Sequence, residues 1–73
     1  MLIDLHGYTE QEAIGKLMSA LITFEFSGED TLEIITGKGY VLTRMVEEYL
    51  EEEMYEYTQP SNNQGTYIVF ARY

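Results

Sequence analysis

Two short stretches of the sequence carry residue types that can hold a phosphate group or transfer a proton. Asp4 and His6 stand just before Gly7, and the motif TGKG occupies residues 36–39. On a strand, residues two apart face the same side, so a carboxylate at position 4 can orient an imidazole at position 6 for general-base catalysis or for holding a metal. The backbone amides of a glycine turn, with Lys38 beside them, can bind an anion.

Each stretch also has a purely structural explanation. A glycine–lysine–glycine turn after a strand is more often only a turn, and TGKG lacks the GxxxxGK[ST] spacing of an ATPase loop, so we reject an ATPase. A histidine at a strand end is more often structural than catalytic. The chain has one histidine, which excludes a metal site with two histidines. The elements that position these residues must therefore be considered.

The first half of the chain predicts a strand, a helix and a second strand. Leu2–His6 is expected to be a strand that ends at Gly7. Thr9-Glu10-Gln11-Glu12 has the capping-box pattern that begins a helix, and Gly28 is a typical helix end. Thr31–Thr36 is the second expected strand. The buried face of the helix is predicted from apolar spacing to contain Ala13, Leu17, Ala20, Leu21 and Phe24, with Ile14 and Met18 beside them.

The second half predicts another helix and two more strands. Met54–Thr58 alternates as a strand does, residues 60–65 are typical of a turn, and residues 66–73 form a strongly apolar strand. The order is thus β-α-β-α-β-β, in which the first two strands are joined by a right-handed crossover and run parallel. The second helix should bury Val41, Leu42, Met45, Val46, Tyr49 and Leu50.

This order brings the two candidate stretches to one edge of the sheet. Parallel strands joined by a crossover end at the same edge, where open α/β sheets usually bind ligands. Each stretch also leads into a helix N-terminus, which presents roughly half a positive charge to an anion. Lys38 and Arg44 should add two of the four basic residues to that edge. We expect the two helix ends to converge on one phosphate.

The charge balance speaks against a strong nucleic-acid binder. The formal net charge is −9, from 13 acidic and 4 basic residues, whereas affinity for nucleic acid depends on neutralising phosphates. Most glutamates lie from Glu47 to Glu56, toward the far end of the second helix. That helix should span roughly 20 Å, beyond a Debye length of about 8 Å at physiological salt. We expect one locally positive edge and weak binding.

Length and composition indicate a single small domain at residues 1–73, a monomer in the cytoplasm. The chain lacks cysteine and any apolar run near the roughly 20 residues that cross a bilayer. Tyr8 and Tyr40 each follow a glycine and are candidates for stacking on a base. Five other aromatic residues are expected in the core and sheet: Tyr49, Tyr55, Tyr57, Tyr67 and Phe70.

The sequence resembles the Smr (small MutS-related) domain over essentially its whole length. The matching segments are IDLHGYTEQEAI, with the DLHG motif at residues 4–7, LEIITGKGYVLTRMVEEYL, with TGKG at residues 36–39, and the final GTYIVFA. The resemblance implies an α/β (α+β) two-layer sandwich, with a mixed four-stranded sheet and two helices on one face, like the C-terminal domain of bacterial translation initiation factor 3.

The resemblance also implies binding of DNA or RNA, and in several members nicking of DNA or cleavage of RNA. It assigns Asp4 and His6 to catalysis. It assigns nucleic-acid binding to Gly37, Lys38 and Gly39, and the expected position of Gly7, Thr36 and Arg44 at the same edge adds them to the binding residues. It leaves the cofactor open, with Mg²⁺ and Mn²⁺ as the ions to test. Such domains also occur within larger proteins, so a partner protein or the ribosome is a candidate for delivering the domain.

Two departures keep three functions open. Thr36 stands where many members have a second histidine, and a hydroxyl cannot exchange protons at neutral pH as imidazole does. The strong acidity fits a free-standing nuclease poorly. The chain is therefore expected to be an Smr-type endonuclease, a nucleic-acid-binding module without chemistry, or a protein-interaction domain that uses its acidic helix.

Overall fold

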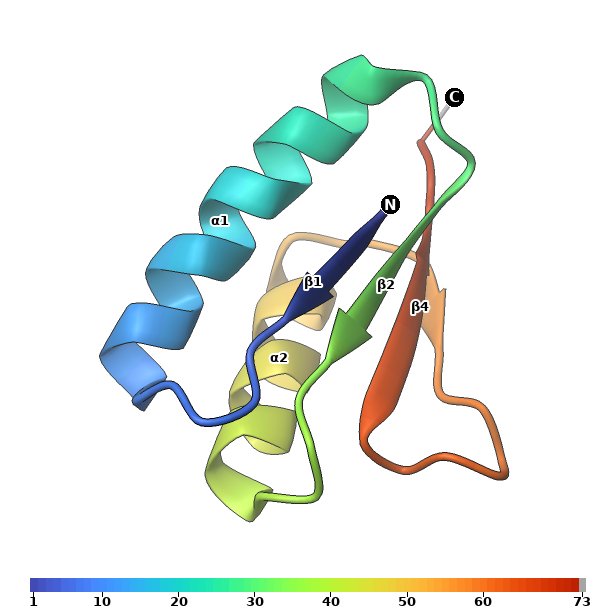
Figure 1. Ribbon diagram of the computed structural model, residues 1–73. Coiled ribbons are helices and arrows are strands. Elements are labelled where there is room, and N and C mark those ends of the chain that lie inside the picture. Colours follow the sequence, from blue (N-terminus) through green and yellow to red (C-terminus); the bar gives the residue numbers. More distant parts are fainter. Residues whose placement is uncertain (73) are drawn as a thin grey trace.

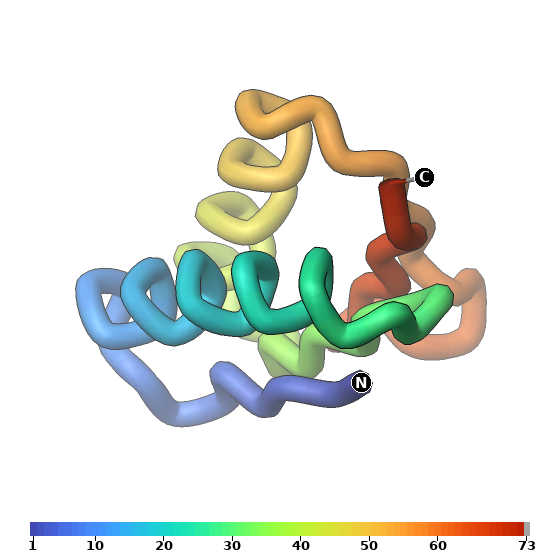
Figure 2. The backbone as a smooth tube through the Cα atoms, turned by 90° about the horizontal axis from the view of Figure 1, so that it is seen from above, coloured from blue at the N-terminus to red at the C-terminus, as the bar shows by residue number. Residues whose placement is uncertain are grey.

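Two helices pack against one face of a four-stranded sheet in the computed structural model, which describes residues 1–72 (Figure 1). Seen from above, both helices lie on the same side of the strands (Figure 2). The sheet order is β1-β2-β4-β3. The fold class predicted from the sequence is confirmed. The elements are β1 (Leu2–Asp4), α1 (Glu10–Ser27), β2 (Thr31–Ile35), α2 (Tyr40–Glu52), β3 (Tyr57–Thr58) and β4 (Thr66–Phe70).

Strand direction decides which loops meet. β1 and β2 are parallel, with Asp4 paired to Ile35, whereas β4 runs antiparallel to both β2 and β3. The chain therefore leaves β1 and β2 at the same edge of the sheet, as expected from the first crossover. We call this edge, formed by residues 5–9 and 36–39, the glycine edge; it lies at the bottom of Figure 1.

The core lies between the sheet and the two helices. Ile34 and Val69 are sheet residues whose side chains are fully buried in this core. The predicted buried face of α1 is confirmed. Met18 is a correction, because it lies on the exposed side of α1. Val41, expected to be buried, is also exposed, because it lies in the first turn of α2 at the glycine edge. The buried residues of the helices are Ala13, Leu17, Ala20, Leu21, Phe24, Leu42, Val46 and Leu50.

The end of α2 explains why β3 is shorter than predicted. The amide of Tyr55 donates to the Leu50 carbonyl at 2.8 Å, and the amide of Met54 donates to Glu51 at 3.1 Å. Met54 has a φ of 61°, so these bonds form a Schellman-type helix end with a left-handed residue. Residues 54–56 are thus used to leave the helix. The strand predicted from Met54 begins only at Tyr57.

The last strand also ends earlier than predicted, at Phe70, and the predicted end at Tyr73 lies outside the described residues. Phe70 belongs to the sheet but is exposed on the face without helices, whereas Tyr67 is buried. Tyr49, Tyr55 and Tyr57 are partly buried against the core. Neither of the two helices within residues 1–72 has the length and apolar character that crossing a membrane would require.

Candidate functional site

The DLHG motif forms a tight turn that presents His6. The amide of Tyr8 donates to the Leu5 carbonyl at 3.1 Å, and Gly7 has a φ of 86°. A positive φ at the third position of a turn favours glycine. The Asp4 carboxylate accepts a hydrogen bond from the backbone amide of His6 at 2.9 Å. Asp4 therefore fixes the backbone that carries the imidazole.

The TGKG loop is held from behind by Gly65. The Gly65 carbonyl accepts hydrogen bonds from the amides of Thr36, at 2.8 Å, and Gly37, at 3.2 Å. Thr36 is only 2% exposed, and its hydroxyl lies within hydrogen-bond distance of the carbonyls of Gly37 and Gly65. The Thr36 side chain therefore points into the protein and holds the loop in place.

Gly65 is a site residue that the sequence prediction treated only as part of a turn. A Cβ added to Gly65 would come within 3.1 Å of the Gly37 backbone. Only glycine allows the two backbones to approach so closely. The signal in the sequence is a glycine placed directly before the apolar strand β4, but the sequence does not indicate its partner 28 residues away.

His6 and Gly37 bring the two motifs together. A Cβ added to Gly37 would lie 3.1 Å from Cδ2 of His6, and Gly37 has a φ of 72°. The imidazole therefore packs directly against the glycine of the second motif. The exposed side chains of His6 and Lys38 lie on the same edge of the sheet, as the crossover predicted.

The two helix ends at this edge are not equivalent. At α1, the Thr9 hydroxyl accepts from the amide of Glu12, and the Glu12 carboxylate accepts from the amide of Thr9 at 3.0 Å. These hydrogen bonds lower the pKa of Glu12. The N-terminus of α1 is thus already occupied by a carboxylate of the same helix. Of the two helix ends expected to face one phosphate, the end of α1 is the less suited to it, because its capping box uses two of its amides and places a carboxylate there.

The N-terminus of α2 is open. Its N-cap is Gly39, which makes no side-chain capping bond. The amide of Gly37 donates to Gly65, but within residues 1–72 the amides of Lys38 and Gly39 have no protein acceptor. Lys38 is exposed and forms no ion pair in that range. Free amides and an ammonium group therefore stand together at a helix N-terminus, which favours an anion.

The positive charge of Arg44 is partly compensated by a neighbouring glutamate. Its Nε donates to Glu48 at 2.8 Å, and its Nη1 donates to the Tyr40 hydroxyl at 2.8 Å. The bond to Glu48, followed by the bond to Tyr40, raises the pKa of the Arg44 guanidinium. Arg44 and Lys38 line the same cleft, but part of the Arg44 charge is compensated within α2.

Lys16 is a basic residue at this edge that the sequence prediction missed. Its Nζ lies 4.8 Å from the centre of the Tyr8 ring, a distance typical of a cation–π contact. Arg72, in contrast, stacks on Tyr55 and donates to the Glu53 carbonyl beyond the end of α2. Three of the four basic residues therefore lie along the glycine edge or the first turns of its helices. The signal for Lys16 was its position about two helical turns after Tyr8.

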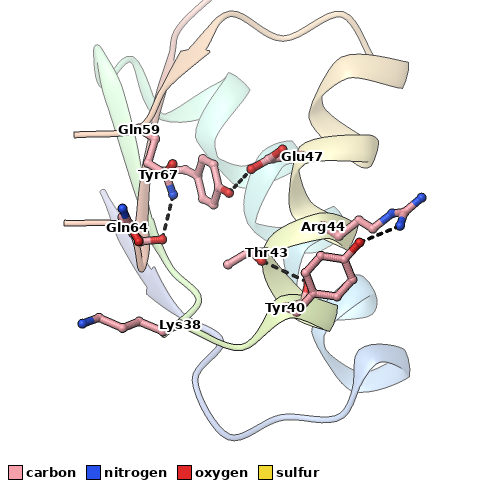
Figure 3. Close-up of a pocket in the computed structure, with 8 residues that line it drawn as sticks. All are labelled: Lys38, Tyr40, Thr43, Arg44, Glu47, Gln59, Gln64 and Tyr67. Carbon is pink, nitrogen blue, oxygen red and sulfur yellow. Dashed lines mark hydrogen bonds between the residues drawn. The ribbon is translucent and has the colours of Figure 1, made fainter. Parts of the chain in front are cut away.

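A cleft of about 510 Å³ opens beside Lys38, between α2 and the chain that joins β3 to β4 (Figure 3). Inside it, the Tyr67 hydroxyl donates to the Glu47 carboxylate. Burial, followed by this hydrogen bond, raises the pKa of Tyr67. The cleft is lined by Lys38, Tyr40, Thr43, Arg44, Glu47, Gln59, Gln64 and Tyr67.

Metal ligands are not grouped at this edge. Within residues 1–72, no three His, Asp or Glu side chains come close enough to hold a metal ion together. Asp4 and His6 alone do not form a Mg²⁺ or Mn²⁺ site, since these ions take several oxygen ligands. We therefore assign no step to a metal.

Comparison with known proteins agrees with this arrangement. The family model named Smr domain matches residues 3–69. The chain belongs to the Smr domain family. Smr domains are known as nucleic-acid-binding domains. A search of curated protein sequences gives no significant match.

Solved Smr domains have the same fold. The Smr domain of Thermus thermophilus MutS2 is 27% identical to this one, with a TM-score of 0.88 over 97% of this chain and 96% of that chain. The human small-MutS related domain is 28% identical, with a TM-score of 0.80 over 96% and 99% of the two chains. The B3BP Smr domain is 25% identical, with a TM-score of 0.80 over 97% and 77%.

Proposed function

We propose that this Smr domain binds the backbone of DNA or RNA at the glycine edge and cleaves a phosphodiester bond there. The observation that carries the proposal is the contact of the His6 imidazole with Gly37, next to the open N-terminus of α2. A proton acceptor and an anion-binding group are thereby adjacent. Membership of a family of nucleic-acid-binding domains supports the choice of a nucleic acid as the anion.

The phosphate would be held mainly by the TGKG loop. The amides of Lys38 and Gly39 are free to donate to its oxygens, and the Lys38 ammonium adds a full positive charge. Hydrogen bonds from charged or dipole-aligned donors to a phosphate are among the stronger ones in proteins. Thr36 and Gly65 would act indirectly, because their hydrogen bonds fix the loop that carries these donors.

His6 would act as the general base. Imidazole is the side chain that most often has this role. His6 would take the proton from the attacking oxygen, which is water on DNA or RNA, or the 2′-hydroxyl on RNA. A new P–O bond forms as the bond to the leaving oxygen breaks, and the leaving oxygen takes a proton from solvent water. Asp4 would position His6 through its bond to the His6 amide.

The charge distribution supports weak binding that depends on salt. Glu48 already compensates Arg44, and the chain as a whole carries a net charge of −9. If two phosphates are neutralised, the logarithm of the binding constant should fall with the logarithm of salt concentration with a slope of about −2. A larger protein, or the ribosome, that delivers the domain to its substrate would compensate for this weak affinity.

The cleavage assay uses supercoiled plasmid and structured RNA with the purified domain, with Mg²⁺ or Mn²⁺ added in separate reactions. His6→Ala should slow cleavage by about 10²- to 10⁴-fold, the usual contribution of a general base. Thr23→Ala changes an exposed position of α1 and is the control for preparation and folding. Equal cutting by the wild type and His6→Ala would remove the catalytic proposal.

A second candidate is a module that binds nucleic acid without cleaving it. The observation in its favour is that Thr36 is buried with its hydroxyl bonded to carbonyls, and His6 is the only imidazole in the sequence. The site therefore has one proton-transfer group where two are often used. NMR shifts at Lys38, Gly39 and Arg44 with short oligonucleotides, together with intact plasmid and RNA, would favour this candidate.

A further inference from the structure

The cleft beside Lys38 differs in chemistry from the phosphate position at the end of α2. It is formed by α2 on one side and by the segment from β3 to β4 on the other (Figure 3). Its volume of about 510 Å³ lies within the range of roughly 300–1,000 Å³ that is usual for small-ligand sites. Only Lys38 and Arg44 among its lining residues are basic, and Arg44 is paired with Glu48.

Glu47 places a carboxylate inside the cleft. The Tyr67 hydroxyl donates to one of its oxygens, and Figure 3 shows the Tyr67 ring pointing toward Glu47 across the cleft. The second carboxylate oxygen remains an acceptor. A carboxylate repels a phosphate but accepts hydrogen bonds from an amino group, as Glu and Asp do from N4 of cytosine. The interior of the cleft therefore disfavours a second phosphate and favours an amino group.

Two glutamines line the other wall. The side-chain Nε2 of Gln59 donates to the backbone carbonyl of Gln64 at 2.7 Å. This bond fixes the Gln59 amide and leaves its oxygen as an acceptor. The side chain of Gln64 brings a second amide to the cleft. Amides can donate and accept at once, which matches the edge of a nucleobase.

Tyr40 lies where the cleft meets the end of α2. Its side chain is 71% exposed, and the Arg44 guanidinium lies 5.9 Å from the ring centre. An exposed ring with a cation beside it is a surface on which a base can stack, and such stacking contributes about 1–3 kcal/mol per base. The stacking surface and Glu47 thus lie on the α2 side of the cleft, and the glutamines lie on the opposite side.

We propose that this cleft binds the base of one unpaired nucleotide next to the phosphate held at Lys38, and that it prefers bases with an exocyclic amino group. The base must be unpaired because its edge has to reach Glu47 and the glutamines. The inference rests on the proposed nucleic-acid function and narrows its substrate class. Substrates would be single strands, loops or other unpaired segments of DNA or RNA.

The test compares single-stranded pentamers of deoxycytidine and deoxyuridine, whose bases differ by an amino or a carbonyl group at C4 and by an acceptor or an N–H donor at the neighbouring N3. NMR titration follows the backbone amides of Lys38 and Gly39 together with the side-chain amides of Gln59 and Gln64. We expect both pentamers to shift the backbone amides. The dC pentamer should bind about five- to tenfold more tightly and alone shift the glutamine side chains strongly.

Glu47→Gln keeps the size of the side chain and gives it a donor, so the preference for dC should disappear or reverse. Glu48→Gln is the matched control: it removes one negative charge but keeps Glu47, frees Arg44 beside Tyr40, and should raise affinity for both pentamers alike. Placing the dC run in a duplex of about 15 base pairs should leave shifts at Lys38 but not at the glutamines.

Three outcomes would overturn the proposal. Equal affinity for the two pentamers, with shifts at Lys38 and none at the glutamines, would leave the phosphate site and remove the base cleft. An unchanged dC preference in Glu47→Gln would show that this carboxylate does not read the base. An absence of shifts at Lys38 with either pentamer at low salt would overturn the proposed function as well.

Discussion

The two loops of the glycine edge share a sequence pattern but differ in what they offer to a ligand. Each runs from a parallel strand through glycine and tyrosine into a helix, at Gly7-Tyr8 and at Gly39-Tyr40. The first helix closes its own N-terminus with Glu12, whereas the second leaves its amides free. The DLHG loop therefore contributes a side chain, His6, and the TGKG loop contributes its backbone. The two loops are similar in sequence but present different groups at the candidate site.

The tyrosines of the two loops show the same difference. Tyr8 has Lys16 beside its ring, and Tyr40 has Arg44. Arg44 is bound to Glu48 on the same helix, while Lys16 forms no ion pair within residues 1–72. The cation beside Tyr40 is thus paired with a glutamate of its own helix, whereas the cation beside Tyr8 contacts the tyrosine ring and lies near Glu12. Positive charge is spread along the edge instead of being concentrated at one end.

The largest expected effect comes from comparing Gly37→Ala with Gly7→Ala. Both glycines have positive φ, so each change should lower the free energy of unfolding by about 1–2 kcal/mol. Only at Gly37 does the added Cβ meet a neighbour, Cδ2 of His6 at 3.1 Å; at Gly7 nothing lies within 4 Å. Displacement of His6 should slow cleavage by about 100-fold in Gly37→Ala.

The measurements are urea unfolding and plasmid nicking, with rates corrected for the folded fraction. The loss of nicking in Gly7→Ala should be clearly smaller than that in Gly37→Ala. Equal losses of cleavage in the two folded variants would mean that the contact of His6 with Gly37 has no special role.

A second, smaller effect is expected when the N-terminus of α2 receives a capping side chain, as the N-terminus of α1 already has. Gly39 has a φ of −69°, and a Cβ there would meet nothing within 4 Å, so a side chain is tolerated. Gly39→Asp should cap α2 and occupy its amides with a carboxylate. We expect oligonucleotide affinity to fall about tenfold, because hydrogen bonds to a charged group contribute roughly 1.5–3 kcal/mol.

Gly39→Asn is the control for this change, since it can cap the helix without adding a negative charge. Fluorescence anisotropy at low salt measures the affinity for the oligonucleotide. Thermal unfolding measures how much the new capping side chain stabilises the folded protein. Both variants should be as stable as the wild type or slightly more so. If Gly39→Asp binds as tightly as Gly39→Asn, the anion does not bind at the end of α2.

The smallest expected effect is on the stability of the protein. It concerns Glu12, which caps the N-terminus of α1 and whose contribution to stability depends on pH. Hydrogen bonds from Thr9 lower the pKa of Glu12 in the folded protein. The stabilisation is therefore present above the ordinary glutamate pKa of about 4.3 and is lost as the pH falls through the lower, folded value. Glu12→Gln should reduce stability slightly near neutral pH, and the difference from wild type should shrink in acid.

Urea midpoints measured across the acid range provide this comparison. Oligonucleotide binding by Glu12→Gln at neutral pH should stay close to that of the wild type, since α1 takes no part in holding the phosphate. Binding that weakens as much as in Gly39→Asp would contradict the division between the two helix ends.

Local patterns predicted most of the fold. The capping box at Thr9, the helix end at Gly28 and the parallel crossover are all confirmed, because each depends on residues close in sequence or on a general rule of handedness. The late start of the strand that was predicted from Met54 was missed. Its left-handed conformation belongs to the termination of α2, which alternation of apolar residues does not reveal.

The site was predicted less completely. The meeting of the two motifs followed from topology, but the inward direction of Thr36 depends on the carbonyl of Gly65, a residue far away in the sequence. The capped end of α1 was readable from the same capping box that began the helix, because the box places the Glu12 carboxylate at that end and uses the amides of Thr9 and Glu12. The pairing of Arg44 with Glu48 follows the ordinary i, i+4 rule and could have been expected.

The close approach of Gly65 to Gly37 makes the shape of the TGKG loop depend on correct alignment of the last strand. If β4 slipped by one residue against β2, Gln64 or Thr66 would replace Gly65 behind the loop, and its Cβ would collide with the Gly37 backbone. A misaligned sheet could then not form the TGKG loop as described. Formation of the TGKG loop thus depends on the register of β4. A molecule whose C-terminal hairpin is misaligned could not form the loop with its free amides.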